Sequence, residues 1–185
     1  MSIDLIIQEG QPFLARRTEI DFWASDHFEI NDPRHEINMI WVGDYFRKNF
    51  MTGERDKGEP ARQAQYMILP FRLSQNALGR QILLSAQQER LKPVQLVDVY
   101  NLVVQQVKME IDVLDMNGRK NFFFVNDNQE QPQCHIVHVK YSLKWRGWGI
   151  GGYPIIHEEE NEAIRHRENA AFTWYAGSRW FFKEP

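Results

Sequence analysis

The chain has 185 residues, of which 43% are hydrophobic and 25% charged, and its formal net charge is −3 at pH 7. These values are ordinary for a folded globular protein and exclude the charge-rich, apolar-poor composition of disordered chains. Because the sequence has no run of Lys or Arg, it lacks the clustered positive charge typical of proteins that bind nucleic acid or anionic lipid. We therefore expect no nucleic acid and no membrane among its partners.

Location is inferred from the first residues and from the cysteine content. Residues Met1–Ile7 contain no basic segment and only a short apolar run, and no later stretch approaches about eighteen apolar residues. Cys134 is the single cysteine and cannot close an internal disulfide. These features predict no signal peptide, no membrane span and a cytoplasmic location, or a place in the virion if the protein is viral.

The N-terminal third gives the weakest pattern. Residues Ile40–Phe50 fit a helix through Val42, Phe46 and Phe50 nearly as well as a strand through Trp41, and both remain open. Thr52–Pro60 is polar and bounded by glycine, which predicts a surface loop. We interpret residues 1–185 as one domain, since the parts on either side of this loop are short for independent folding.

Two helices are predicted in the middle of the chain. Apolar residues recur at helical spacing between Ser74 and Leu91, and Pro93 suits the first turn of a second helix. The apolar positions are Leu78, Ile82, Leu83 and Ala86 in the first helix, and Leu96, Val99, Tyr100 and Val103 in the second. The valines of the second segment also suit a strand, which remains an alternative.

A tight β-hairpin is expected next, because Asn117-Gly118 can adopt the two positive φ angles of a type I′ turn. With these two residues at the tip, Val113 faces Phe122 and Ile111 faces Phe124.

Residues Cys134–Trp145 alternate in polarity and predict a half-buried antiparallel strand. The glycine-rich run Gly147–Gly152 resembles a phosphate loop only superficially, since no helix follows, and we interpret it as a flexible turn. The segment Phe172–Phe182 indicates one interrupted strand or two short strands. Together these elements predict an α+β fold in which an antiparallel sheet carries two central helices on one face.

Few side chains point to chemistry. On a helix, Glu159, Glu162 and His166 would share a face able to ligate a metal, but the spacing matches no known zinc pattern, and a solvated helix is favoured. His135 and His138 are three apart on a strand and point to opposite faces, so they cannot share a metal. We expect His135 at the core edge with one nitrogen bonded to backbone, and Cys134 as an unreactive thiol. No metal or cofactor is predicted.

Aromatic residues make up 13% of the sequence and crowd its C-terminal quarter. About half of these rings should lie in the core, Trp174 among them. We expect the remainder to form a partner-binding surface, because Trp, Tyr and Arg are enriched at interface hot spots. Its predicted residues are Trp148, Tyr153, Arg179 and Trp180.

The leading functional hypothesis is a non-catalytic interaction or assembly subunit of a larger complex, such as a virion or phage tail. It would dock through its C-terminal aromatic region on a protein partner or a second copy of itself. The alternative is a small enzyme or ligand-binding protein with an aromatic pocket, using His135, Glu159 or His166 as acid-base or metal-binding groups.

Overall fold

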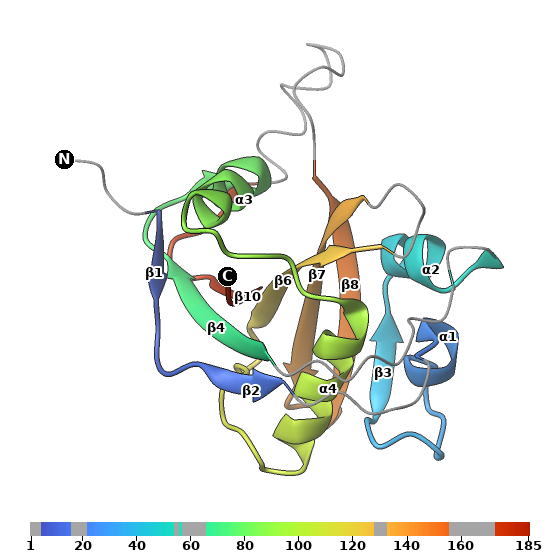
Figure 1. Ribbon diagram of the computed structural model, residues 1–185. Helices are drawn as coiled ribbons and strands as arrows, with labels where there is room; N and C mark the ends of the chain where they lie inside the picture. Colours follow the sequence, from blue (N-terminus) through green and yellow to red (C-terminus); the bar gives the residue numbers. More distant parts are fainter. Residues whose placement is uncertain (1–4, 16–21, 54–55, 57–65, 128–132, 156–172) are drawn as a thin grey trace.

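The computed structural model describes residues 5–15, 22–53, 56, 66–127, 133–155 and 173–185. Most strands in these ranges join one large mixed sheet, with short helices packed on it (Figure 1). Its eight strands are β1 (Ile6–Gln8), β2 (Phe13–Ala15), β3 (Met39–Val42), β4 (Tyr66–Leu73), β6 (Lys120–Asn126), β7 (Cys134–Ser142), β8 (Gly147–Pro154) and β10 (Arg179–Lys183). The other elements are helices α1 (Ala24–His27), α2 (Asp44–Phe50), α3 (Gly79–Gln88) and α4 (Leu96–Val107), and a small sheet of β5 (Ala77–Leu78) with β9 (Thr173–Trp174).

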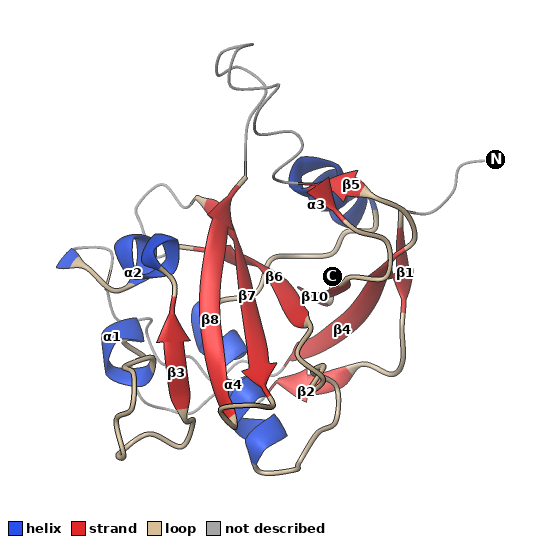
Figure 2. Ribbon diagram, turned by 180° about the vertical axis from the view of Figure 1, so that it is seen from behind, coloured by secondary structure: helices blue, strands red, loops and turns tan. Residues whose placement is uncertain are grey.

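The strand order in the large sheet is β1-β4-β10-β6-β7-β8-β3, and β2 also pairs with β4. Two of the pairings are parallel, β10 with β6 and β3 with β8, while the others are antiparallel. The prediction of an antiparallel sheet is therefore wrong. Figure 2 shows β7 and β8 side by side with β3 beyond β8 at the edge.

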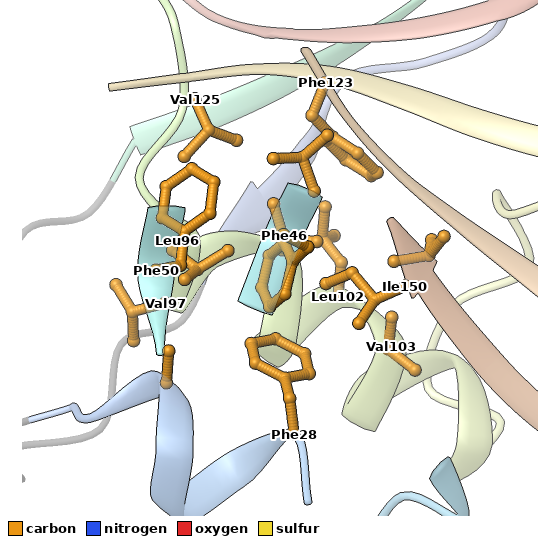
Figure 3. Packing of buried hydrophobic residues seen from close by; sticks show 14 of the residues in the cluster. Phe28, Phe46, Phe50, Leu96, Val97, Leu102, Val103, Phe123, Val125 and Ile150 are labelled. Atoms are coloured by element: carbon orange, nitrogen blue, oxygen red, sulfur yellow. The ribbon is translucent and has the colours of Figure 1, made fainter. Parts of the chain in front are cut away.

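Side chains from the two faces of this sheet enter two separate hydrophobic clusters, because successive residues of a strand point to opposite faces. On one face, which we call the α4 face, Phe123 and Val125 of β6 and Phe181 of β10 pack with α1, α2 and α4 (Figure 3). On the other, the α3 face, Phe122 and Phe124 pack with residues of α3, β5 and β9.

The two central helices occupy these opposite faces. Ile82 of α3 belongs to the cluster on the α3 face, whereas Leu96 and Val103 of α4 belong to the cluster on the α4 face. The expectation that both helices cover one face is thus wrong. The helical spacing predicted the helices, but it carries no information about the face on which each one packs.

The predicted hairpin at Asn117-Gly118 is also wrong. Gly118 has the expected positive φ of 84°, but no strand forms between α4 and β6, and Val113 and Phe122 pack in different clusters. The Asp115 carboxylate accepts the backbone N–H groups of Asn117 at 2.8 Å and Arg119 at 3.4 Å. Since a side chain closes this turn, the chain enters β6 without a preceding paired strand.

Two further segments settle alternatives that the sequence left open. Residues 40–50 contain both predicted structures in succession, the end of β3 and helix α2, with Gly43 between them. The C-terminal segment forms two short strands, β9 and β10, in different sheets. Most of the predicted 52–60 loop lies outside the described residues, and its assignment stays a prediction.

Candidate functional site

The predicted partner-binding residues divide into two buried rings and two partly exposed side chains. Trp148 is 2% exposed and Trp180 0% exposed, so the expectation that these rings face outward is wrong. Tyr153 is partly buried, and its hydroxyl accepts a hydrogen bond from Lys120 Nζ at 2.6 Å. Arg179 is one-third exposed and donates to the Val113 carbonyl at 2.8 Å. Partner binding through Tyr153 and Arg179 stays a prediction.

Trp180 is buried because β10 lies between β4 and β6 in the interior of the sheet. Its ring stacks on Phe122 and Phe124, with centroids 4.9 and 5.1 Å away. Trp174 is 9% exposed and meets Trp180 edge to face at 5.5 Å, which agrees with its predicted core position. The protein's own sheet therefore covers the apolar C-terminal segment.

The glycine-rich run is β8 itself, and the prediction of a flexible turn is wrong. A Cβ on Gly149 would lie 3.0 Å from the Trp41 ring, and one on Gly151 would lie 2.7 Å from that ring and 2.6 Å from His138 Cε1. A Cβ on Gly43 would be 2.8 Å from the same indole. The Trp41 ring therefore packs directly against Gly43, Gly149 and Gly151, which we call the glycine bed. A side chain at any of the three positions would displace the ring.

Trp41 leaves 49% of its surface exposed on the α3 face. Gly149, beneath its ring, pairs with Lys140 of β7, which in turn pairs with Lys120 of β6. Because directly paired residues point to the same face, both lysines lie in one row with the indole. Lys140 is exposed and Lys120 half-buried.

The β7–β8 turn continues this row into a tip that combines apolar and basic groups. Leu143 is 62% and Trp145 65% exposed, and Lys144 Nζ lies 4.8 Å from the Trp145 ring centroid. Arg146 holds a φ of 49°, and its carbonyl accepts a hydrogen bond from Asn38. We call the set of Trp41, Lys120, Lys140, Leu143, Lys144, Trp145 and Arg146 the Trp41 surface.

Sequence reasoning missed this surface, although two signals were present. Glycines alternate at 147, 149 and 151, which is the period of one face of a strand. Residues 134–156 contain Lys140, Lys144 and Arg146 but no Asp or Glu. A locally basic hairpin in a chain of net charge −3 is the sequence signal that could have located this surface.

Beneath the Trp41 surface, His138 is 3% exposed and stacks on Tyr153 with centroids 5.3 Å apart. Burial lowers the pKa of His138 to about 3, assisted by the charges of Lys120 and Lys140. Its Nδ1 has no hydrogen-bond partner within the described part of the chain, and neither has Trp174 Nε1. A neutral imidazole of this kind belongs to the aromatic packing and cannot serve as a base near neutral pH.

His135 lies on the opposite face of β7, as predicted, but its nitrogens bond side chains and not backbone. Nδ1 lies 2.8 Å from the Tyr45 hydroxyl, and Nε2 lies 3.2 Å from Asp127 Oδ2. Neighbouring Cys134 has its pKa raised to about 12 by burial and by the Asp127 charge. The thiol is therefore not a nucleophile at ordinary pH, in line with its predicted inertness.

The candidate metal residues Glu159, Glu162 and His166 lie outside the described residues. Where the structure does describe side chains, no group of three His, Cys, Asp or Glu residues is placed to hold a metal ion. Among the described helices, none combines the length and apolar character needed to cross a membrane.

Comparison with known proteins gives no relative: no protein-family model, no curated protein and no solved structure matches this chain. Function must therefore be inferred from the site geometry alone.

Proposed function

We propose that the protein is an interaction subunit that binds an acidic protein partner through the Trp41 surface. The observation that carries this proposal is the half-exposed Trp41 ring on its bed of glycines. A large ring fixed before binding loses little conformational freedom on association, which is a property of interface hot spots.

The charge of the surface supports the choice of partner. Lys140, Lys144 and Arg146 are exposed on the same hairpin as Leu143 and Trp145, and this hairpin contains no carboxylate. Positive groups beside Trp and Leu complement a partner segment that combines Asp or Glu with apolar residues. This retains the class of function expected from the sequence but moves the docking region from the C-terminal strands to β3, β7 and β8.

The partner class can be tested by selecting random displayed peptides on the full chain and measuring the affinity of the enriched sequences. We expect enrichment of acidic peptides containing an apolar anchor. Trp41→Ala and Lys140→Glu should each weaken their binding about tenfold or more, the loss expected of a hot-spot residue. Tyr175→Ala is the matched control, because this ring is 71% exposed but lies outside the Trp41 surface.

Two outcomes would overturn the proposal. One is binding that survives both substitutions, and the other is single-stranded oligonucleotide binding with the same dependence while no peptide binds. A second copy of the chain is the remaining candidate partner. If the mass in solution is that of a dimer that Trp41→Ala dissociates, the surface is a self-association site.

A further inference from the structure

A continuous chain of hydrogen bonds joins Tyr45, His135 and Asp127 on the α4 face, the opposite side of the sheet from the Trp41 surface. Asp127 is fixed at the end of β6, where its Oδ1 accepts the Gln133 backbone N–H at 2.9 Å and its own N–H donates to the Gln133 carbonyl. Its Oδ2 contacts His135, and His135 contacts Tyr45. The His135 and Asp127 side chains are only 6% and 8% exposed.

The carboxylate determines the direction of these hydrogen bonds. An ionised Asp127 only accepts, so His135 Nε2 must carry the proton that it donates. Nδ1 of the neutral ring is then left as an acceptor, and the Tyr45 hydroxyl donates to it at 2.8 Å. This is the arrangement of acid, imidazole and hydroxyl that activates nucleophiles, with a phenol as the hydroxyl.

Packing contacts restrict the movement of the His135 imidazole and the Tyr45 ring. Phe50 packs edge to face on the His135 imidazole at 5.1 Å, and the Tyr45 ring lies where a Cβ on Gly152 would approach Cδ1 to 2.9 Å. Tyr45 is partly exposed, whereas the side chains of His135 and Asp127 are buried.

We propose that Tyr45 is a nucleophile that accepts an acyl group from a carboxylic ester. The phenol oxygen forms a bond to the carbonyl carbon, and the bond from that carbon to the leaving oxygen breaks. The phenol proton moves to His135 Nδ1 and from there to the leaving oxygen, while Asp127 stabilises the intermediate imidazolium. Tyr45 is the catalytic residue, and Asp127 is a positioning residue.

The surroundings indicate the substrate class. The described contacts of the imidazole are the Phe50 and Tyr45 rings, and the charged group among them is the Asp127 carboxylate. An apolar site with a negative charge suits an uncharged acyl ester, whereas a phosphate ester would be repelled.

The test exposes the full chain to p-nitrophenyl acetate, follows release of nitrophenolate and locates acetyl groups by peptide mass spectrometry. Tyr45 should be acetylated about 100-fold faster than the more exposed Tyr175, which is the lower range of general-base assistance. Its rate should level off well below pH 10, whereas an unassisted phenol gains rate up to about pH 10 as it ionises.

Asp127→Asn and His135→Gln provide the variants. The D127N amide can donate to Nε2, which would place the imidazole proton on Nδ1 and slow Tyr45 acetylation about tenfold or more. Melting temperature and the Tyr175 rate report whether each variant is folded. The proposal fails if Tyr45 reacts no faster than Tyr175, or if folded variants react at the wild-type rate. If both variants unfold, two measurements on the wild-type protein still decide the question: the ratio of the Tyr45 and Tyr175 acetylation rates, and the pH at which the Tyr45 rate levels off.

Discussion

Trp180 and Trp41 lie on the same face of one sheet but have opposite surroundings. Trp180 is in the interior strand β10, stacked on Phe122 and Phe124, and is fully buried. Trp41 is in the edge strand β3, lies flat over glycines and is half exposed. Trp180 is buried because other aromatic rings pack on it. Trp41 packs on glycines, which hold the ring in place but have no side chains to cover it.

The largest expected effect separates these two tryptophans by stability. Trp180→Ala should lower the free energy of unfolding by about 3 to 5 kcal/mol, because it leaves a cavity in a packed cluster. Trp41→Ala should cost about 1 kcal/mol or less, because half of the ring already contacts water. Equal losses in urea unfolding would show that Trp41 is a core residue, and the comparison would be wrong.

The second effect concerns pH, through His138 beneath Trp41. Its pKa falls from 6.5 to about 3 on folding, so below pH 6.5 the unfolded chain binds a proton that the folded chain does not. The His138 contribution to stability is therefore complete above pH 6.5 and is lost toward pH 3, at about 1.4 kcal/mol per pH unit. His138→Phe should reduce the measured slope of unfolding free energy against pH between 6 and 4 by about that amount. An unchanged slope would mean that His138 can become protonated in the folded protein.

The glycine bed can be tested at Gly151. Gly151→Ala should destabilise the protein by about 1 to 3 kcal/mol, because the new methyl group meets the Trp41 ring and the buried His138 ring. In a Trp41→Ala background the cost should be smaller, since one of the two clashes is gone. A double-mutant cycle by thermal unfolding measures the coupling between positions 41 and 151. Additive effects would contradict the close contact between Gly151 and the Trp41 ring.

The smallest effect is expected at Gly118, in the turn that precedes β6. Gly118→Val should cost about 1 kcal/mol because valine resists the positive φ of 84° at this turn. Apart from its two chain neighbours, no described residue has an atom within 4 Å of a Cβ at this position, so the substitution measures backbone strain. Chemical denaturation of this variant beside Gly151→Ala compares strain with steric clash.

Local sequence pattern predicted some helices and strands correctly, but it did not predict which elements they pair or pack with. The spacing of Ile82 and Ala86, and of Leu96, Val99 and Val103, predicted helices that the structure contains as α3 and α4. Neither the parallel pairing of β10 with β6 nor the face on which each helix packs follows from neighbouring residues. Both depend on contacts between distant parts of the sequence.

The candidate sites show the same limit. Strand alternation correctly separated His135 from His138, but Tyr45 and Asp127 come from other elements, and no spacing in the sequence links them to His135. Gly147–Gly152 was interpreted by composition as a turn. Its true role depends on Trp41, more than a hundred residues earlier in the sequence.

The position of β10 has a consequence for the order of folding. Among the described strands, β10 is the one that joins β4, with its partners β1 and β2, to the group of β6, β7, β8 and β3, yet it follows all of them in the sequence. Until residues 179–183 are present, the hydrogen bonds that join these two parts of the sheet cannot form, and the facing edges of β4 and β6 have no β10 to pair with. Such edges invite strand pairing between chains. Because β10 pairs with strands far earlier in the sequence, we expect this closure to be a late and slow step of folding.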